Sequence, residues 1–542
     1  MKEFLKTNKR RVIFSLLAGI PEGLFLTLGY QLQHKGAIPF VSPLFWLSVI
    51  GFCILATAGG YLLLFLLDRR KAVAKDGKSD VSEETGKKKN PFRSGKFWLF
   101  AGIFILTYFF WGVQLLAIYP GFFNYDAPNQ WVTYATSAVT SHHPVLHTYL
   151  VGKCIHLSFN IFGNALPGCA LYILIQMLVT DLALLRICKF LSDRKAPVFM
   201  HILSALWFSF SPMVVLNVMS VTKDSLFAPF FIVFLTECAD LAADYEGYLK
   251  KWYHIAVLCI SAFFSAILRN NAIYIMVPVL IYLIVRYLKN KRILAVASVF
   301  LALIIYLGPV CSAITVDGIN EREYLSVPTQ QIMRIYHLHG NELAPEEKAM
   351  IEDAFEEEAL VLYVPKIADV AKGNLKRDVF DQKKGEYFRL WLSLGLRYPG
   401  EYINSFLMGN YGFWYPFATL ALTADGAEGY FVCRSYNPVW DSNKISVIAN
   451  YYKHFESSEI TCKYPATIWF FAPATYFTIA FFTFVCLWYR KRKEVLALVV
   501  ALLVWATFLL GPVALVRYVS YLFYLLPVEC ALLFFDKNRE TK

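Results

Sequence analysis

The amino-acid sequence predicts an α-helical polytopic membrane protein. Residues of the hydrophobic class make up 57% of its 542 positions, whereas charged residues make up only 17%. Aromatic residues also reach 17%, which is far from the composition of soluble domains. Because a membrane-spanning helix needs about 20 mostly apolar residues, each long apolar run of the chain predicts one span.

Twelve apolar runs approach the length of a membrane span, although two or three of them are short. We therefore expect about twelve transmembrane helices. The runs are Val12–Tyr30, Leu44–Leu67, Phe97–Ile118, Ala165–Cys188, Val198–Met219, Leu226–Leu241, Trp252–Leu268, Ala272–Leu288, Ile293–Ile314, Ala466–Tyr489, Val495–Leu510 and Val513–Phe535.

Basic residues cluster in the short segments between these runs, and the positive-inside rule places such segments in the cytoplasm. The net charge of +12 therefore indicates a membrane topology rather than a nucleic-acid partner. With all basic segments inside, both termini are cytoplasmic and the number of spans is even. The segments are Lys2–Arg11, Asp68–Lys96, Arg194–Lys195, Lys250–Lys251, Lys289–Arg292, Arg490–Lys493 and Lys537–Arg539.

One apolar stretch, Val145–Phe162, is predicted to lie in the outer membrane interface rather than to cross the bilayer. If it crossed, every later basic segment would be placed outside. The consequence is one external loop, Tyr119–Asn164, that contains juxtamembrane helices. The first span follows a basic segment but lacks a convincing cleavage site, so we expect a membrane anchor rather than a signal peptide.

The chain is predicted to have three parts. Residues 1–314 form an N-terminal transmembrane block, residues 315–465 an extracytoplasmic domain and residues 466–542 a C-terminal transmembrane block. Within the external domain, Pro345–Leu360 and Gln382–Leu407 show helical patterns.

Other segments give weaker signals. The cytoplasmic segment Lys71–Asn90 is predicted to be disordered, and Thr423–Gly426 is predicted to be a turn. Cys433 and Cys462 fall in the external domain, where a disulfide and two unpaired thiols are open alternatives. No cysteine or histidine spacing in the sequence predicts a zinc site.

A small set of polar residues falls at the outer ends of the predicted spans. Charges near a bilayer are costly and tend to mark function. The set consists of Asn124, Tyr125, Asp126, Asn129, His142, His143, His147, Lys223, Asp224, Arg269, Asn270, Asn271 and Arg517.

These residue types suit a transfer reaction at the membrane surface. The Asp126 carboxylate could take a proton from an incoming hydroxyl group. The cations Lys223, Arg269 and Arg517 could hold a phosphate and stabilise the leaving group. The asparagines and histidines of the set could bind substrate, and the rings of Tyr125, Trp131 and Tyr134 could stack on a sugar.

Structural roles for the same residues stay open. Asp126 could cap a short helix, and Lys223 could pair with Asp224 in a tight turn. Arg269 and Arg517 could extend to lipid headgroups. His143-Pro144 could simply start the next helix.

Four motifs, FNYDAPNQ, SHHPVLHT, VTKDSLF and LRNNAIY, occur in this order on the predicted outer face. Together they resemble motifs of the polyprenyl-phosphate-dependent glycosyltransferases of the GT-C superfamily. More closely, they resemble a family of bacterial membrane proteins of GT-C type, mainly from Gram-positive organisms. The resemblance covers about Phe97 to Leu288 and, more weakly, the last spans.

The resemblance implies a GT-C-like fold in the bacterial plasma membrane, with an extracytoplasmic active site. It implies transfer of a sugar from a polyprenyl-phosphate-linked donor to an external glycan or lipid acceptor, with Asp126 as catalytic base and Asp224 as a second acid. Such enzymes generally need no metal, because arginine and lysine hold the leaving phosphate. A metal held by Asp126 and the histidines stays an alternative. The usual paired acidic motif is reduced here to Asp126, which leaves donor and acceptor open.

Three other functions are alternatives to this one. A polymerase or ligase using a lipid-diphosphate donor would share the same kind of site. A secondary transporter or flippase suits the number of spans, but the halves are not symmetric and the polar residues gather at one face. A scaffold for envelope assembly has no positive feature in the sequence.

Overall fold

The computed structural model describes residues 2–76, 95–316, 324–422, 427–442, 444–457 and 467–535. Within these ranges nearly all regular structure is helical, and strand-like pairing is limited to four isolated β-bridges. Eight helices there are long and apolar enough to cross a membrane, or nine if one bent pair counts as a span. The prediction of a helical multi-pass membrane protein is confirmed, whereas the count of twelve spans stays a prediction.

Some predictions lie outside the described residues. Most of the segment Lys71–Asn90, the turn Thr423–Gly426 and Cys462 fall there. Cys433 is buried with a free thiol that donates a hydrogen bond to the carbonyl oxygen of Phe431. Whether Cys433 can pair with Cys462 therefore stays open.

The candidate spans follow the predicted apolar runs. They are α1 (Lys2–Lys35), α2 (Pro43–Asp76), α3 (Gly95–Ala117), α6 (Leu166–Asp193), α9 (Lys223–Ala243), η2 (Asn270–Ala272) with α12 (Ile273–Tyr287), the run η3 (Lys291–Val296), α13 (Ala297–Ile305), η4 (Tyr306–Val310) and α14 (Cys311–Ile314), and η10 (Val516–Val519) with α27 (Tyr521–Phe534). The bent pair is α7 (Val198–Phe210) and α8 (Pro212–Val218), which meet at 60°. Shorter apolar helices are α11 (Trp252–Leu268), α25 (Pro473–Tyr489) and α26 (Val495–Phe508).

Helix α9 lies at the centre of the bundle. Nearly all of its side chains are buried, and it packs against α6, α11, α26 and α27. A helix that is apolar on all sides must be enclosed by others, which explains this central position. The first residues of α9 are therefore held in place by four surrounding helices.

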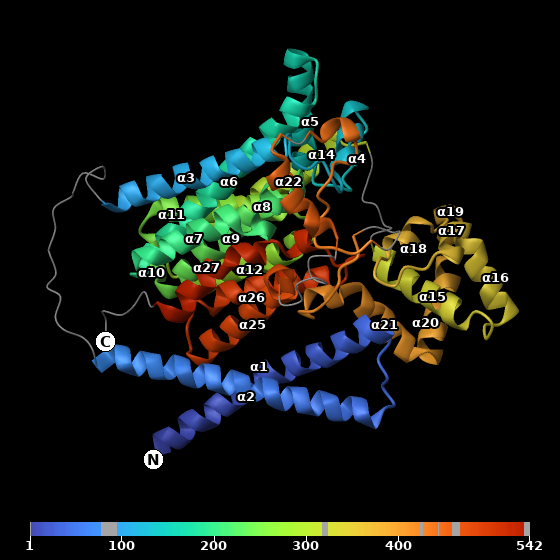
Figure 1. The fold of residues 1–542 in the computed structure, drawn as a ribbon, viewed down its shortest axis with the longest axis horizontal. Helices are drawn as coiled ribbons and strands as arrows, with labels where there is room; N and C mark the ends of the chain where they lie inside the picture. Colours follow the sequence, from blue (N-terminus) through green and yellow to red (C-terminus); the bar gives the residue numbers. More distant parts are fainter. Residues whose placement is uncertain are drawn as a thin grey trace.

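Helices α1 and α2 cross at one side of the bundle (Figure 1), and α1 packs against α25. Gly19 and Gly23 of α1 face the backbone of Thr57 and Cys53, where an added Cβ would come within 2.5 Å of backbone atoms. Small residues allow such close helix packing in membranes. Many apolar side chains of α2 stay exposed, as expected for a surface that contacts lipid.

Helix α5 (Val145–Phe162) has the predicted boundaries, and it is not among the candidate spans. One face packs on α6, while Leu157, Ile161 and Phe162 are exposed. The helix ends at Gly163, whose φ of +63° is a left-handed conformation that favours glycine. In Figure 1, α5 projects from the bundle next to the short helix α4 (Ala127–Ala135).

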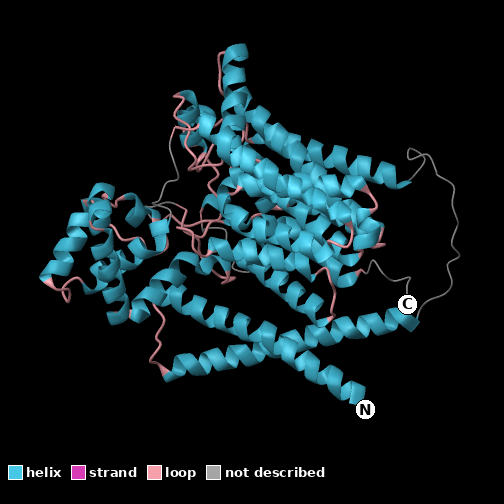
Figure 2. Cartoon of the chain, turned by 180° about the vertical axis from the view of Figure 1, so that it is seen from behind, coloured by secondary structure: helices cyan, strands magenta, loops and turns pink. Residues whose placement is uncertain are grey.

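A lobe of short helices lies at one end of the bundle, as Figures 1 and 2 show. It has its own hydrophobic cluster, which includes Met333, Ile335, Phe355 and Leu394. Its helices are α15 (Ser326–His339), α16 (Pro345–Ala354), α17 (Glu357–Val361), α18 (Asp369–Gly373), α19 (Arg377–Gln382), α20 (Lys384–Arg397) and α21 (Pro399–Asn410).

Both predicted helical patterns of this lobe are split in two. The pattern Pro345–Leu360 breaks at Phe355, whose backbone is extended, and Gln382–Leu407 breaks before Pro399, the first residue of α21. The remaining elements of the external region are short: η6 (Tyr411–Phe413), η7 (Pro438–Trp440), α22 (Ser446–Lys453), η8 (His454–Glu456) and α24 (Ile468–Phe471). The predicted boundaries of the three parts stay predictions.

Candidate functional site

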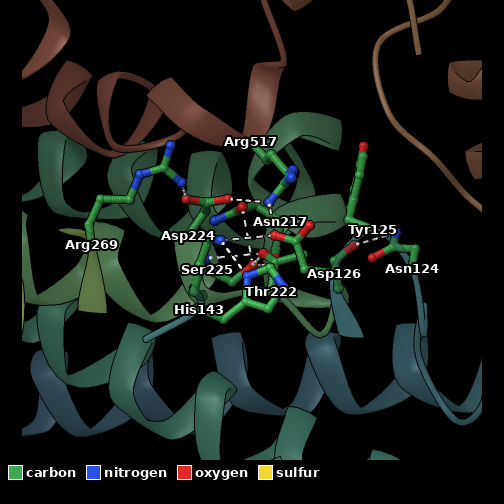
Figure 3. Close-up of polar contacts among 12 residues, drawn as sticks. Asn124, Tyr125, Asp126, His143, Asn217, Thr222, Asp224, Ser225, Arg269 and Arg517 are labelled. Carbon is green, nitrogen blue, oxygen red and sulfur yellow. Dashed lines mark hydrogen bonds and ion pairs between the residues drawn. The ribbon is translucent and has the colours of Figure 1, made fainter. Parts of the chain in front are cut away.

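Four segments that are far apart in the chain meet at one end of the bundle. They are the loop before α4, the first turn of α9, the end of α11 and the element η10, and they bring together Asp126, Lys223, Asp224, Arg269 and Arg517. Figure 3 shows these segments around one point. We call the five residues the charged cluster.

The loop before Asp126 is fixed to the loop before α9 by backbone pairing. The Phe122 N–H donates to the carbonyl of Met219 at 2.8 Å, and the Val221 N–H donates to the carbonyl of Phe122 at 3.0 Å. Gly121 has a φ of +100°, and a Cβ there would lie 2.8 Å from Ile173. Only glycine fits this close approach. The pairing places Asp126 beside the start of α9.

The start of α9 is fixed by its own cap and by α6. The Thr222 hydroxyl accepts a hydrogen bond from the Ser225 N–H, which is the usual arrangement of a helix N-cap. The Gln176 side chain donates to the carbonyls of Val218 at 2.6 Å and Ser220 at 3.0 Å. These bonds satisfy carbonyl groups that the end of α8 leaves open.

The charged cluster is joined by direct ion pairs. Asp126 Oδ2 lies 3.0 Å from Lys223 Nζ and 3.2 Å from Arg517 Nη1. Asp224 Oδ2 lies 2.7 Å from the same Arg517 Nη1, and Asp224 Oδ1 pairs with Arg269. Two carboxylates and three cations leave a surplus of one positive charge.

The two aspartates differ in their access to solvent. The Asp224 side chain is only 1% exposed, and both of its oxygens face arginine. The Asp126 side chain is 27% exposed and its partner Lys223 is 17% exposed. The cluster is therefore open on the side of Asp126 and Lys223, which we call the mouth.

The open structural roles are resolved by these contacts. Asp126 does occupy the N-cap position of α4, but its side chain makes no capping hydrogen bond. Lys223 pairs with Asp126 rather than with Asp224. Arg269 and Arg517 are buried in the protein instead of extending to lipid. His143-Pro144 does precede α5, with Pro144 at its N-cap.

The guanidinium groups of the two arginines lie over the faces of aromatic rings. Arg517 lies over the rings of Tyr125 and Tyr518, with 4.4 and 4.7 Å from the guanidinium carbon to the ring centres. Arg269 lies over Tyr518 at 4.4 Å and Phe508 at 4.6 Å. Arg517 Nε is buried and has no hydrogen-bond partner among the described residues. A buried donor without a partner is costly, so Arg517 keeps one N–H group that the described residues leave unsatisfied.

Neighbouring charges set the protonation of the cluster. Burial alone would raise the pKa of Asp126, but the charges of Lys223 and Arg517 outweigh it and hold the pKa well below its usual value. Burial, with the nearby Lys223, lowers the pKa of His143 to about 3. His143 is therefore neutral at pH 7, and its Nδ1, 3.2 Å from Lys223 Nζ, accepts a hydrogen bond. Burial lowers the pKa of Arg269 to about 10, which keeps it charged.

Three predicted substrate residues have structural contacts instead. His147 is buried between Gln130 and Tyr172, at 3.1 and 2.8 Å from its two ring nitrogens. Trp131 stacks on Phe159 of α5, and Tyr134 packs on α5 at Gly152. These contacts explain how α4 is fixed to α5.

The predicted asparagines lie at different distances from the cluster. Asn271 accepts a hydrogen bond from Arg269 Nε at 3.1 Å and so orients that arginine. Asn270 donates to the carbonyl of His142 at 3.4 Å, and the His142 ring lies 4.5 Å from that of His143. Asn129 is exposed on α4.

One part of the site was missed by the sequence analysis. Residues 430–442, which we call the strap, run along the loop before Asp126. The Val432 carbonyl accepts from Asn124 Nδ2 at 2.5 Å, and the Val432 N–H donates to the Tyr125 hydroxyl at 2.9 Å. In the sequence, the strap carries a turn signal, the residues Tyr436-Asn437-Pro438. Such irregular segments have no periodicity from which their partners can be inferred.

Within the described ranges, no three histidine, cysteine, aspartate or glutamate side chains are grouped as they would be around a metal ion.

Comparison with known proteins gives a family without an assigned activity. Residues 130–541 match the model of a family described as "Family of unknown function (DUF6020)", and the matched part includes Lys223, Asp224, Arg269 and Arg517. No curated protein and no solved structure matches the chain. Because the matched residues make up more than half of the sequence, the chain belongs to the DUF6020 family.

Proposed function

We propose that this protein is a membrane glycosyltransferase of GT-C type. It transfers a sugar from a polyprenyl-phosphate-linked donor to an acceptor outside the bacterial plasma membrane. The observation that carries this proposal is the charged cluster at the ends of apolar helices. Asp126 lies at its mouth, and Lys223, Arg269 and Arg517 are its three cations.

The surplus charge of the cluster supports a monophosphate donor. A polyprenyl-phosphate sugar is a phosphodiester with one negative charge, which matches the surplus of one positive charge. A lipid-diphosphate donor carries at least two, so the complex would hold a negative charge near the membrane. Two like unit charges about 4 Å apart repel each other by about 4 kcal/mol at an effective dielectric constant of about 20, so a second phosphate charge without a counter-charge is unfavourable. The charge balance thus favours this donor over the polymerase or ligase alternative.

Donor binding would also prepare Asp126 for catalysis. In the free protein Asp126 is a weak base, because Lys223 and Arg517 hold its pKa low. A phosphate bound to the same cations shares their charge, so the pKa of Asp126 rises towards the range of a useful base.

The reaction can be written with the groups present. The acceptor hydroxyl gives its proton to Asp126, and its oxygen forms a bond to the anomeric carbon of the sugar. The bond between that carbon and the phosphate oxygen breaks, and polyprenyl phosphate leaves with the electron pair. Arginine and lysine stabilise the charge that develops on this phosphate.

Asp224 has a positioning role in this proposal rather than a catalytic one. It is nearly inaccessible, and each of its two oxygens pairs with one arginine, Oδ1 with Arg269 and Oδ2 with Arg517. Preorganised donors of this kind stabilise developing charge without rearranging during the reaction.

The membrane arrangement belongs to the same proposal. The eight candidate spans, the bent pair and the three shorter apolar helices α11, α25 and α26 would together give twelve spans. The charged cluster then faces the outside, and both termini lie in the cytoplasm.

The experiment compares wild-type protein with Asp126→Asn in liposomes that contain a labelled polyprenyl-phosphate sugar. General base catalysis contributes about 10²–10⁴-fold, so we expect the variant to lose at least 100-fold of the release of polyprenyl phosphate while keeping its elution profile. Asp193→Asn, a matched change in a partly exposed ion pair with Lys189 that lies outside the charged cluster, should retain full activity. Wild-type-like release by Asp126→Asn would refute the proposal, and transport of the donor across the liposome membrane without cleavage would favour a flippase.

A further inference from the structure

The strap is anchored to the three residues that precede Asp126. Besides the two bonds from Val432, the Ser435 hydroxyl accepts from the Phe123 N–H at 3.2 Å. The Tyr436 N–H donates to the Phe123 carbonyl at 3.2 Å. The Trp440 ring stacks on the Phe123 ring with centroids 4.1 Å apart. The backbone of the strap is therefore held rigidly beside the loop that carries the proposed base.

Arg434 and Tyr436 are among the exposed side chains of this anchored segment. Phe431, Cys433 and Ser435 are buried, whereas the Arg434 side chain is 58% exposed and Tyr436 is 49% exposed. Residues two apart in an extended segment lie on the same face, so Arg434 and Tyr436 share one surface. An aromatic ring that is left exposed on a fixed backbone loses little conformational entropy when a ligand stacks on it.

This surface adjoins the mouth of the charged cluster. The Tyr436 N–H donates a hydrogen bond to the carbonyl of Phe123, which lies three positions before Asp126, so this part of the strap runs beside the loop that carries the proposed base. Arg434 Nε pairs with Glu456 Oε1 at 3.0 Å, so the charges next to Tyr436 balance each other. A neutral ligand with many hydroxyl groups fits an exposed ring beside a paired donor and acceptor better than an anion does.

We propose that the strap is the acceptor site, and that the acceptor is a neutral carbohydrate whose ring stacks on Tyr436. Its hydroxyl groups bond to Arg434 and Glu456, and one further hydroxyl reaches Asp126. This inference rests on the proposed function and narrows it, because it selects a glycan rather than a lipid headgroup as the acceptor.

The test uses the full-length protein in liposomes with labelled donor. The probes are soluble neutral oligosaccharides of glucose, galactose, mannose and N-acetylglucosamine, each also supplied on a lipid anchor. Because Tyr436→Ala removes the stacking surface, it should raise the acceptor KM up to about ten-fold with a smaller change in kcat. Tyr436→Phe keeps the ring and should stay near wild type. The soluble and lipid-anchored arms show whether the acceptor must itself be in the membrane.

Tyr451→Ala is the matched control, because Tyr451 is similarly exposed but lies on α22 outside the strap. Equal KM values for Tyr436→Ala and wild type would overturn the acceptor site, as would the absence of saturable binding by every oligosaccharide. Hydrolysis of the donor without any acceptor is measured in parallel on wild type and Asp126→Asn. If that hydrolysis does not depend on Asp126, the proposed glycosyltransferase function is contradicted. Direct binding of the oligosaccharides to the protein then still tests whether the strap is a carbohydrate site.

Discussion

At the scale of single residues, the two aspartates of the charged cluster differ in how their oxygens are paired. Asp126 shares one oxygen between Lys223 and Arg517, whereas Asp224 uses both oxygens for two arginines. Residue type and topology were sufficient to select all five members of the charged cluster. They were not sufficient to predict which cation pairs with which aspartate, because the sequence does not show that Lys223 pairs with Asp126 rather than with its neighbour Asp224.

The low pKa of Asp126 gives a prediction about pH dependence. The pKa of Asp126 is lower in the folded protein than the value near 3.9 expected in the unfolded chain. The ion pairs of Asp126 therefore stabilise the fold fully above that unfolded pKa, and this stabilisation is lost only as the pH falls through the folded pKa. Asp126 of the free protein should therefore not titrate between pH 5 and 8, and kcat/KM for the donor should lack an acid limb there. If bound phosphate raises this pKa, the profile of kcat should show an acid limb at higher pH than the profile of kcat/KM. Coincident acid limbs would contradict the proposed activation of Asp126.

A second prediction at this scale concerns Asp224→Ala, which leaves Arg269 and Arg517 without a buried counter-charge. Removing one partner of a buried ion pair costs about 3–5 kcal/mol, so the free energy of unfolding in detergent should fall by about that amount. The matched control is Asp193→Ala, which breaks an exposed pair and should cost less than about 1 kcal/mol. Unfolding by denaturant is followed by tryptophan fluorescence. Similar losses of unfolding free energy in the two variants would show that the charged cluster does not stabilise the fold.

At the scale of helices and loops, the site is made by helix ends. The bend between α7 and α8 at Pro212 returns the chain to the cluster, and Gln176 of α6 holds the carbonyls at the end of α8. The apolar runs predicted these helices well, including the boundaries of α5. The bend was missed, because the run Val198–Met219 is apolar on both sides of Ser211-Pro212. The strap was missed because it binds by backbone groups and single side chains.

The element scale yields a prediction for Gln176→Leu. The change removes the donor that serves the carbonyls of Val218 and Ser220, and an unsatisfied buried group costs about 1–3 kcal/mol. Lys223 and Asp224 should shift with the loop before α9, so the donor KM should rise while every charged residue stays in place. Gln382→Leu, an exposed glutamine at the end of α19, should change neither stability nor KM. A normal donor KM in Gln176→Leu would show that the loop is positioned by other contacts.

At the scale of the whole molecule, the helical lobe and the charged cluster lie at the same end. The lobe reaches the cluster through backbone contacts, because the Ala368 N–H donates to the Pro512 carbonyl at 2.7 Å and Ile367 pairs with Val513. Val513 leads directly into η10 and Arg517. Basic segments and apolar runs predicted this placement at a common end. The internal packing of the lobe could not be predicted, since its short helices depend on contacts distant in sequence.

The predicted topology can be checked by labelling. Asn129 on α4 and Lys251 at the start of α11 are both exposed, and they are expected on opposite sides of the membrane. In intact cells, a membrane-impermeant maleimide should label Asn129→Cys at once and Lys251→Cys only after permeabilisation. The unmodified protein gives the background from its native cysteines, most of which are buried. Labelling of Lys251→Cys in intact cells would show the opposite orientation and would contradict a reaction outside the cell.

The position of Arg517 in the chain also bears on biosynthesis. It pairs with carboxylates that precede it by 391 and 293 positions, so both have left the ribosome long before Arg517 is synthesised. A nascent chain that stops ahead of Val516 holds two aspartates against Lys223 and Arg269 alone, and its charges cancel. Such a truncated product can still insert most of its helices, but it has no excess positive charge with which to attract an anion. Stop codons ahead of Val516 should therefore be as damaging as the loss of the aspartates themselves.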